Sequence, residues 1–143
     1  MARRVLAALA ATVALVLGLS ILAFGQTEPS PEEAAVAAAT EWMALVDAGE
    51  YGESWDEASS LLRAAITREE WERQVGAVRA AFGAVNDREV RSRTSTTSLP
   101  GAPDGHYVVI ELSTSFEQKA DAVETVTPRL EEGVWRVSGY YVR

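Results

Sequence analysis

Glu124 is the residue whose type and setting best fit acid–base chemistry. It shares one side of an alternating stretch with Ala122 and Val126, so its carboxylate is expected to point toward the interior. A buried carboxylate must be paired, hydrogen-bonded or neutral. Three side chains are available as the partner: Arg136, Tyr140 and Tyr51. A salt bridge across neighbouring strands is the commoner role, and a general acid or base is the sharper one. The adjacent Val123 is also apolar, and if it pointed to the interior Glu124 would point outward. The orientation of Glu124 therefore stays open.

The four tryptophans are a second set of candidates, because a curved sheet over helices often encloses an apolar ligand pocket. They are Trp42, Trp55, Trp71 and Trp135. Core packing is the commoner role for such aromatics. Trp55 lies in a polar run and is expected at a pocket edge or on a partner surface. The residues that we predict for a ligand pocket are Trp42, Tyr51, Trp55, Glu124, Arg136 and Tyr140.

Motifs for catalysis or metal binding are absent from the sequence. One histidine and no cysteine leave only scattered carboxylates as ligands. Neither a nucleophile elbow nor a phosphate-binding glycine loop occurs. His106 follows the Asp104-Gly105 turn and is interpreted as an exposed turn residue. We therefore predict no catalytic residue, no metal and no cofactor, and leave enzymatic activity open while favouring a non-catalytic role.

Three helical segments are expected in the first half of the chain. Ser30 and Glu33 form a capping box around Pro31, which predicts a helix that runs to about residue 48 and ends at Gly49. A short segment at residues 53–58 follows, with an apolar continuation to residue 66. A third helix is expected from Thr67 to Gly83. Its apolar stripe consists of Trp71, Val75, Val78 and Phe82.

Alternating residues replace the helical pattern after Gly83 and predict four strands. They cover residues 88–98, 106–117, 122–130 and 133–143. Pro128 lacks the donor that a central strand needs, so it is expected at a bulge or where the missing donor faces no neighbouring strand. In the last strand, strict alternation places Val137 and Tyr141 with Trp135 against the helices. The predicted fold is α+β, with N-terminal helices packed on a curved four-stranded antiparallel sheet.

The N-terminus has the pattern of a targeting segment. Arg3 and Arg4 precede twenty uncharged residues, 5–24, and small residues then offer a cleavage site before Gln26. Residues 1–25 are therefore predicted to be a signal peptide, or alternatively an uncleaved membrane anchor, because twenty apolar residues can span a bilayer. A short tether at residues 26–30 and a single domain at residues 31–143 follow. Both alternatives place the domain outside the cytoplasm, either periplasmic or secreted, or anchored to the membrane.

The net charge of the chain limits its partners. It is −8 at neutral pH, with the acids concentrated in the first half. Nucleic acid is a poor partner for such a chain, because binding to it depends on neutralising phosphates. A membrane contact is expected only through residues 1–25, if they are not cleaved.

Several stretches of the chain together resemble a family of small exported bacterial domains, the domain of unknown function 4019 family. They are residues 42–51 (WMALVDAGEY), 54–55 (SW), Trp71, 101–107 (GAPDGHY), 124–127 (ETVT) and 133–141 (GVWRVSGYY). The resemblance implies a secreted or periplasmic domain without an assigned reaction. It also implies an arrangement similar to cystatin-like and nuclear-transport-factor-like (NTF2-like) folds, in which a curved sheet wraps a helix. It assigns no catalytic residue.

Three functional hypotheses follow. The first is a non-catalytic module that binds a small apolar ligand or a protein partner on its concave sheet face. The second is a small pocket enzyme that uses Glu124 with an aromatic hydroxyl. The third is a membrane-anchored accessory subunit, which requires that residues 1–25 are retained.

Overall fold

The computed structural model describes residues 28–143, and it confirms the predicted α+β class. Four helices precede four strands: α1 (Pro31–Asp47), α2 (Tyr51–Asp56), α3 (Ser60–Ala65), α4 (Arg68–Phe82), β1 (Val85–Thr96), β2 (Tyr107–Phe116), β3 (Lys119–Glu131) and β4 (Val134–Val142). The predictions for residues 1–25 lie outside this described part. Within residues 28–143, no helix is long and apolar enough to cross a bilayer.

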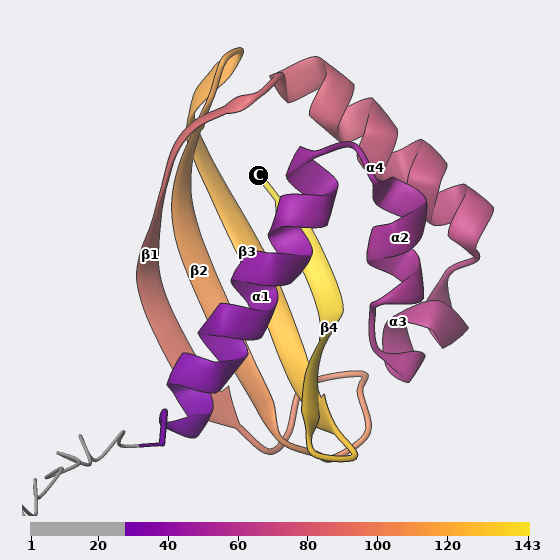
Figure 1. The fold of residues 1–143 in the computed structure, drawn as a ribbon, viewed down its shortest axis with the longest axis vertical. Coiled ribbons are helices and arrows are strands. Elements are labelled where there is room, and N and C mark those ends of the chain that lie inside the picture. Colours follow the sequence, from indigo (N-terminus) through magenta and orange to yellow (C-terminus); the bar gives the residue numbers. More distant parts are fainter. Residues whose placement is uncertain (1–27) are drawn as a thin grey trace, which may run out of the picture.

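The sheet is an antiparallel meander in the order β1-β2-β3-β4. Helix α1 crosses its face diagonally, and α2, α3 and α4 stack beside it beyond β4 (Figure 1). Strand β1 forms one edge, is rich in polar residues and has two register shifts against β2. Bulges and charges on an edge strand discourage pairing with other chains.

The local signals at the helix ends act as the sequence predicts. The Ser30 hydroxyl accepts a hydrogen bond from the Glu33 amide at 3.2 Å, and the Glu33 carboxylate accepts one from the Ser30 amide at 2.8 Å. Gly49 has a φ of 79°, a conformation that glycine adopts without steric cost, and it follows the end of α1. The predicted capping box and helix end are therefore confirmed.

The region between α1 and α4 contains two short helices, not one continuous segment. Ser59 separates them, because its hydroxyl caps α3 by accepting from the Leu62 amide at 3.2 Å. Its own amide donates to the Val137 carbonyl of β4 at 2.9 Å. Ser59 thus satisfies one of the outward-facing backbone groups of the β4 edge.

A bulge in β4 overturns the strict alternation that we predicted there. The register moves from Thr127 opposite Gly139 to Pro128 opposite Val137, so Ser138 is the extra residue. Pro128 lies at this bulge, as predicted. Beyond Ser138 the faces are exchanged, so Tyr140 turns toward the core and Tyr141 is 58% exposed.

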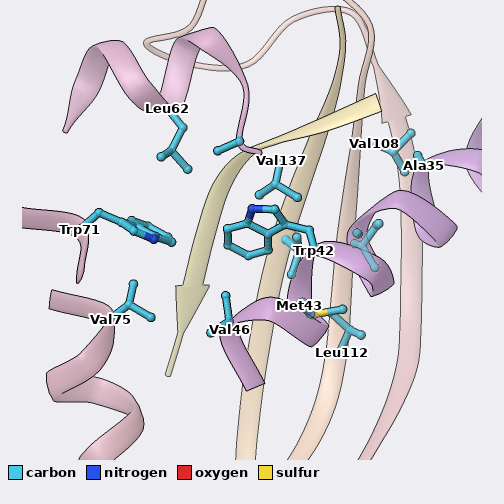
Figure 2. Close-up of a cluster of buried hydrophobic side chains, with 14 residues drawn as sticks. Ala35, Trp42, Met43, Val46, Leu62, Trp71, Val75, Val108, Leu112 and Val137 are labelled. Atoms are coloured by element: carbon cyan, nitrogen blue, oxygen red, sulfur yellow. The ribbon is translucent and has the colours of Figure 1, made fainter. Parts of the chain in front are cut away.

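The core lies between α1, the ends of α2–α4 and the inner sheet face (Figure 2). Trp42 reaches from α1 to Trp71 of α4 and Tyr140 of β4, with ring centroids 5.8 Å and 5.5 Å away. Buried Ser54 joins these helices, because its carbonyl accepts from the Trp42 indole at 2.7 Å and its hydroxyl from the Trp71 indole at 3.0 Å. The Ser-Trp pair of the sequence thus supplies a polar junction inside the core.

The buried face of α4 differs from the predicted apolar stripe. Trp71 and Val75 are buried, but Val78 is 38% exposed and Arg79 takes the next buried position. Arg79 is buried because a carboxylate of α1 lies beside it. The prediction that Val78 belongs to the buried stripe of this helix is therefore wrong.

Removing the Trp42 side chain should destabilise the fold strongly. Trp42→Ala is expected to lower the free energy of unfolding by about 3–5 kcal/mol, because a large buried ring is replaced by a cavity. Chemical denaturation followed by circular dichroism measures this change. The control Tyr141→Ala should change stability by no more than about 0.5 kcal/mol, because the ring is exposed. Similar losses in the two variants would contradict the placement of the β4 faces.

Candidate functional site

Glu124 is the centre of a buried polar network between β1, β2, β3 and β4. Its side chain is fully buried, so of the two orientations considered from the sequence the inward one occurs. Arg88 of β1 donates to both carboxylate oxygens, from Nε to Oε2 at 2.6 Å and from Nη2 to Oε1 at 3.1 Å. The Thr114 hydroxyl donates to Oε2 at 2.5 Å and the Tyr140 hydroxyl to Oε1 at 2.6 Å. Four hydrogen bonds therefore converge on one carboxylate.

Asp47, the last residue of α1, extends this network to the helices. Arg88 Nη1 donates to Asp47 Oδ2 at 2.6 Å, and Nη2 donates to Oδ1 at 3.0 Å. Arg79 of α4 donates to the same Oδ1 at 2.7 Å and stacks over the Phe116 ring at 5.0 Å. Two arginines and two carboxylates thus balance in charge where α1, α4 and the sheet meet.

Burial and ion pairing shift the pKa values of this network. Burial raises the pKa of Tyr140, and the neighbouring Glu124 carboxylate raises it further. Burial alone would raise the pKa of Asp47, but hydrogen bonds from Arg88 and Arg79 outweigh it and lower the pKa. Burial likewise opposes the charge of Arg88, while hydrogen bonds to Asp47 and Glu124 raise its pKa. The hydrogen bonds between Asp47 and Arg88 therefore keep both side chains ionised.

The geometry of Glu124 suits structure better than catalysis. A carboxylate offers about four acceptor positions, and Arg88, Thr114 and Tyr140 fill all of them. A general base needs a free acceptor within reach of a substrate proton. The Tyr140 hydroxyl donates a hydrogen bond to Glu124, and its raised pKa keeps the hydroxyl protonated. Of the three partners considered from the sequence, Tyr140 is the one that hydrogen-bonds to Glu124. The network holds the sheet and helices together.

A groove opens at the far end of the sheet, where α1 begins. Its volume is about 630 Å³, within the range of small-molecule sites. The first turn of α1, the end of β1 and the adjoining ends of β2, β3 and β4 surround it. We call it the end groove, and its principal walls are Pro31, Glu32, Ser95, His106, Leu130 and Trp135. Apolar walls with a few polar groups at the rim can hold an organic ligand.

A second, smaller groove lies along α1 on the side of β4. Its volume is about 360 Å³, and Trp135 borders it as well as the end groove. We call it the lateral groove, and its walls include Ala38, Glu41, Leu45, Glu57, Val134 and Arg136. Arg136 donates to the Glu57 carbonyl at 3.2 Å and lies 3.5 Å from its carboxylate. Trp135 thus forms part of the wall of both grooves.

The six predicted pocket residues do not converge on one site. Glu124 and Tyr140 meet in the buried network, while Trp42 and Arg136 border the lateral groove. Arg136 does not pair with Glu124 as considered from the sequence, but with Glu57.

The other two pocket candidates lie on α2. The Tyr51 ring packs close to Gly76 of α4, and the Trp55 indole donates to the Ile66 carbonyl at 2.9 Å. Both side chains are partly buried against the core.

Several residues of the network and the end groove were missed. Sequence patterns do not identify Arg88, Asp47 and Arg79 as members of the network, because their partners are distant in the sequence. Only the packing of α1 and α4 against the sheet brings these side chains together. Glu32 lies in the first turn of α1, and the Ser95 hydroxyl of β1 donates to its carboxylate. Polar residues at the inward positions of β1 were the available signal for the network. Within residues 28–143, no group of side chains has the composition of a metal site.

Comparison with known proteins places the domain in a family. The model of the family described as "Protein of unknown function (DUF4019)" matches residues 38–140. The chain belongs to this family. The match spans α1 to β4 and so includes every member of the Glu124 network. This confirms the resemblance stated from the sequence.

Solved structures support the fold of this DUF4019 domain. One is Aln2 from a Streptomyces species, to which the chain is 16% identical, with a TM-score of 0.50. The similarity covers 82% of this chain and 93% of that one, and at this identity it concerns the fold alone. Among curated proteins, none matches the chain.

Removing the Tyr140 hydroxyl should weaken the DUF4019 domain. Tyr140→Phe is expected to lower the free energy of unfolding by about 1–3 kcal/mol, because one oxygen of buried Glu124 loses a donor. Tyr141→Phe is the matched control on the exposed face and should have no measurable effect. Urea unfolding of both variants tests this, and equal stabilities would contradict the network.

Removing the Asp47 charge should make the free energy of unfolding less dependent on pH in the acid range. The folded-state pKa of Asp47 is lowered, so its contribution is complete above the unfolded pKa of about 3.9 and declines as pH falls through the folded pKa. At pH 7, Asp47→Asn should cost on the order of 2–3 kcal/mol, because Arg79 and Arg88 lose their shared carboxylate.

The difference between wild type and Asp47→Asn should shrink below about pH 4, as protonation removes the same charge from the wild type. Thermal unfolding of both proteins across this range measures it. A difference that stays constant from pH 7 to the acid limit would show that the charge of Asp47 does not contribute.

Proposed function

We propose that this DUF4019 domain is an exported, non-catalytic binding module that holds a small, largely apolar molecule in the end groove. The observation that carries the proposal is the groove of about 630 Å³ between α1 and the sheet end, with Leu130 and Trp135 in its wall. The groove replaces the concave sheet face as the site, because Trp42 and other core side chains fill that face. The export signal predicted at residues 1–25 supports a place outside the cytoplasm.

The state of Glu124 supports a non-catalytic role over the pocket enzyme. Its carboxylate is fully buried, and its four acceptor positions are used within the protein. The end groove has Glu32, His106 and Tyr107 as titratable wall residues, but Glu32 accepts from the Ser95 hydroxyl and the Tyr107 hydroxyl donates to the Pro103 carbonyl. Recognition of an apolar body by such walls requires no covalent step.

A matched pair of groove variants tests this proposal. Thr97 lies in the end groove, whereas Thr94 pairs with Val109 on the outer sheet face. Thr97→Trp places a large ring in the groove, and Thr94→Trp adds the same ring elsewhere. The protein as isolated from producing cells is screened against a panel of small metabolites by thermal shift.

A ligand of the end groove should raise the unfolding midpoint of wild type and Thr94→Trp by several degrees, because it binds only the folded state. It should not raise that of Thr97→Trp. A ligand that stabilises all three proteins equally would exclude the end groove as its site. Failure of the whole panel to stabilise wild type would count against the binding role.

A further inference from the structure

We propose that the ligand of the end groove is a cationic amphiphile, with an aliphatic or aromatic body against Trp135 and a positively charged head at Glu32. This inference rests on the proposed function and specifies its ligand class. It combines the charges at the rims of the two grooves with the position of Trp135 between them.

The charged groups at the groove rims favour a cation. Glu32 borders the end groove, and the hydrogen bond from Ser95 lowers the pKa of its carboxyl group. The lateral groove adds Glu41 and Glu57. Arg136 is the one arginine or lysine among the residues that line the two grooves, and Glu57 lies beside it at 3.5 Å. Arg93 of β1 lies outside the linings, and its charge is a smaller cause of the lowered pKa of Glu32. An anionic head would meet like charge at the rims, whereas a cationic head would find a carboxylate.

Trp135 supplies the apolar contact for the ligand body. It is partly buried against the core and borders both grooves, so its indole is accessible from either side. Leu130 pairs with Trp135 across the β3–β4 ladder and lines the end groove with it. An indole also attracts a cation through its ring face. One side chain can therefore contact both the body and, at short range, the head of such a ligand.

Tryptophan quenching by brominated amphiphiles tests this inference. The protein as isolated from producing cells is titrated with ω-bromoundecyl trimethylammonium, ω-bromoundecanol and ω-bromoundecanoate, each below its micelle concentration. Bromine quenches an indole only at close contact. We expect saturable quenching that is tightest for the ammonium probe and weakest for the carboxylate. Trp135→Phe should abolish the saturable part, because Trp42 and Trp71 are buried and Trp55 lines neither groove.

A charge-matched pair of variants isolates the role of Glu32. Glu32→Gln should weaken binding of the ammonium probe about two- to fivefold, the range for an exposed ion pair, and leave the alcohol unchanged. Glu89→Gln removes the same charge from an exposed residue of β1 outside both grooves and should change neither. Both variants retain Trp135, so this test does not depend on whether Trp135→Phe folds.

Each outcome decides between the proposals. If the alcohol and ammonium probes bind equally and quench Trp135, the groove is a binding site but the cationic head is wrong. Tighter binding of the carboxylate, or equal effects of Glu32→Gln and Glu89→Gln, would also overturn the charge assignment. A third outcome is that no probe gives saturable quenching, while a metabolite still stabilises wild type and not Thr97→Trp. The end groove would then be a binding site, as proposed, but its ligand would not be a cationic amphiphile.

Discussion

The salt bridge between Arg88 and Glu124 is the interaction on which the rest of the structure depends. Burying a carboxylate in a sheet is costly unless it is paired and all its acceptor positions are used. The fork of Arg88 fills two of those positions, and one hydroxyl each from β2 and β4 fills the others. The network therefore specifies the relative positions of four strands. The alternation of apolar residues disfavours a shift by one residue, and the network also disfavours a shift by two, which would keep the same faces inward.

The bulge at Ser138 reconciles this network with the apolar core. Before the bulge, β4 directs Val137 inward, and after it Tyr140 turns inward to reach Glu124 and Trp42. Without the extra residue, Tyr141 would face the helices and Tyr140 the solvent. The same strand thus supplies Trp135 to the grooves at one end and a hydroxyl to the buried carboxylate at the other. Structure and proposed function use opposite ends of β4.

Local signals predicted the elements of this fold well, and long-range pairing limited the rest. The Ser30 capping box, the end of α1 at Gly49 and the bulge at Pro128 each depend on a few adjacent residues, and all occur. The faces of β4 and the burial of Arg79 depend on partners far away in the chain. The groove is harder still, because the ends of five separate elements form it. Periodicity indicates which residues of a regular element face inward, but it contains no information about bulges or about the spaces left between elements.

The position of Tyr140 in the last strand has a consequence for how the domain folds. The network joins α1, α4, β1, β2, β3 and β4, so its carboxylate remains incompletely satisfied until nearly every element is present. Contacts over such long separations in sequence slow folding, because the chain loses much of its freedom before they form. An N-terminal fragment would lack the donors of β4 and could not reach the native state alone. The domain is thus expected to fold in one late, cooperative step, after the final strand is available.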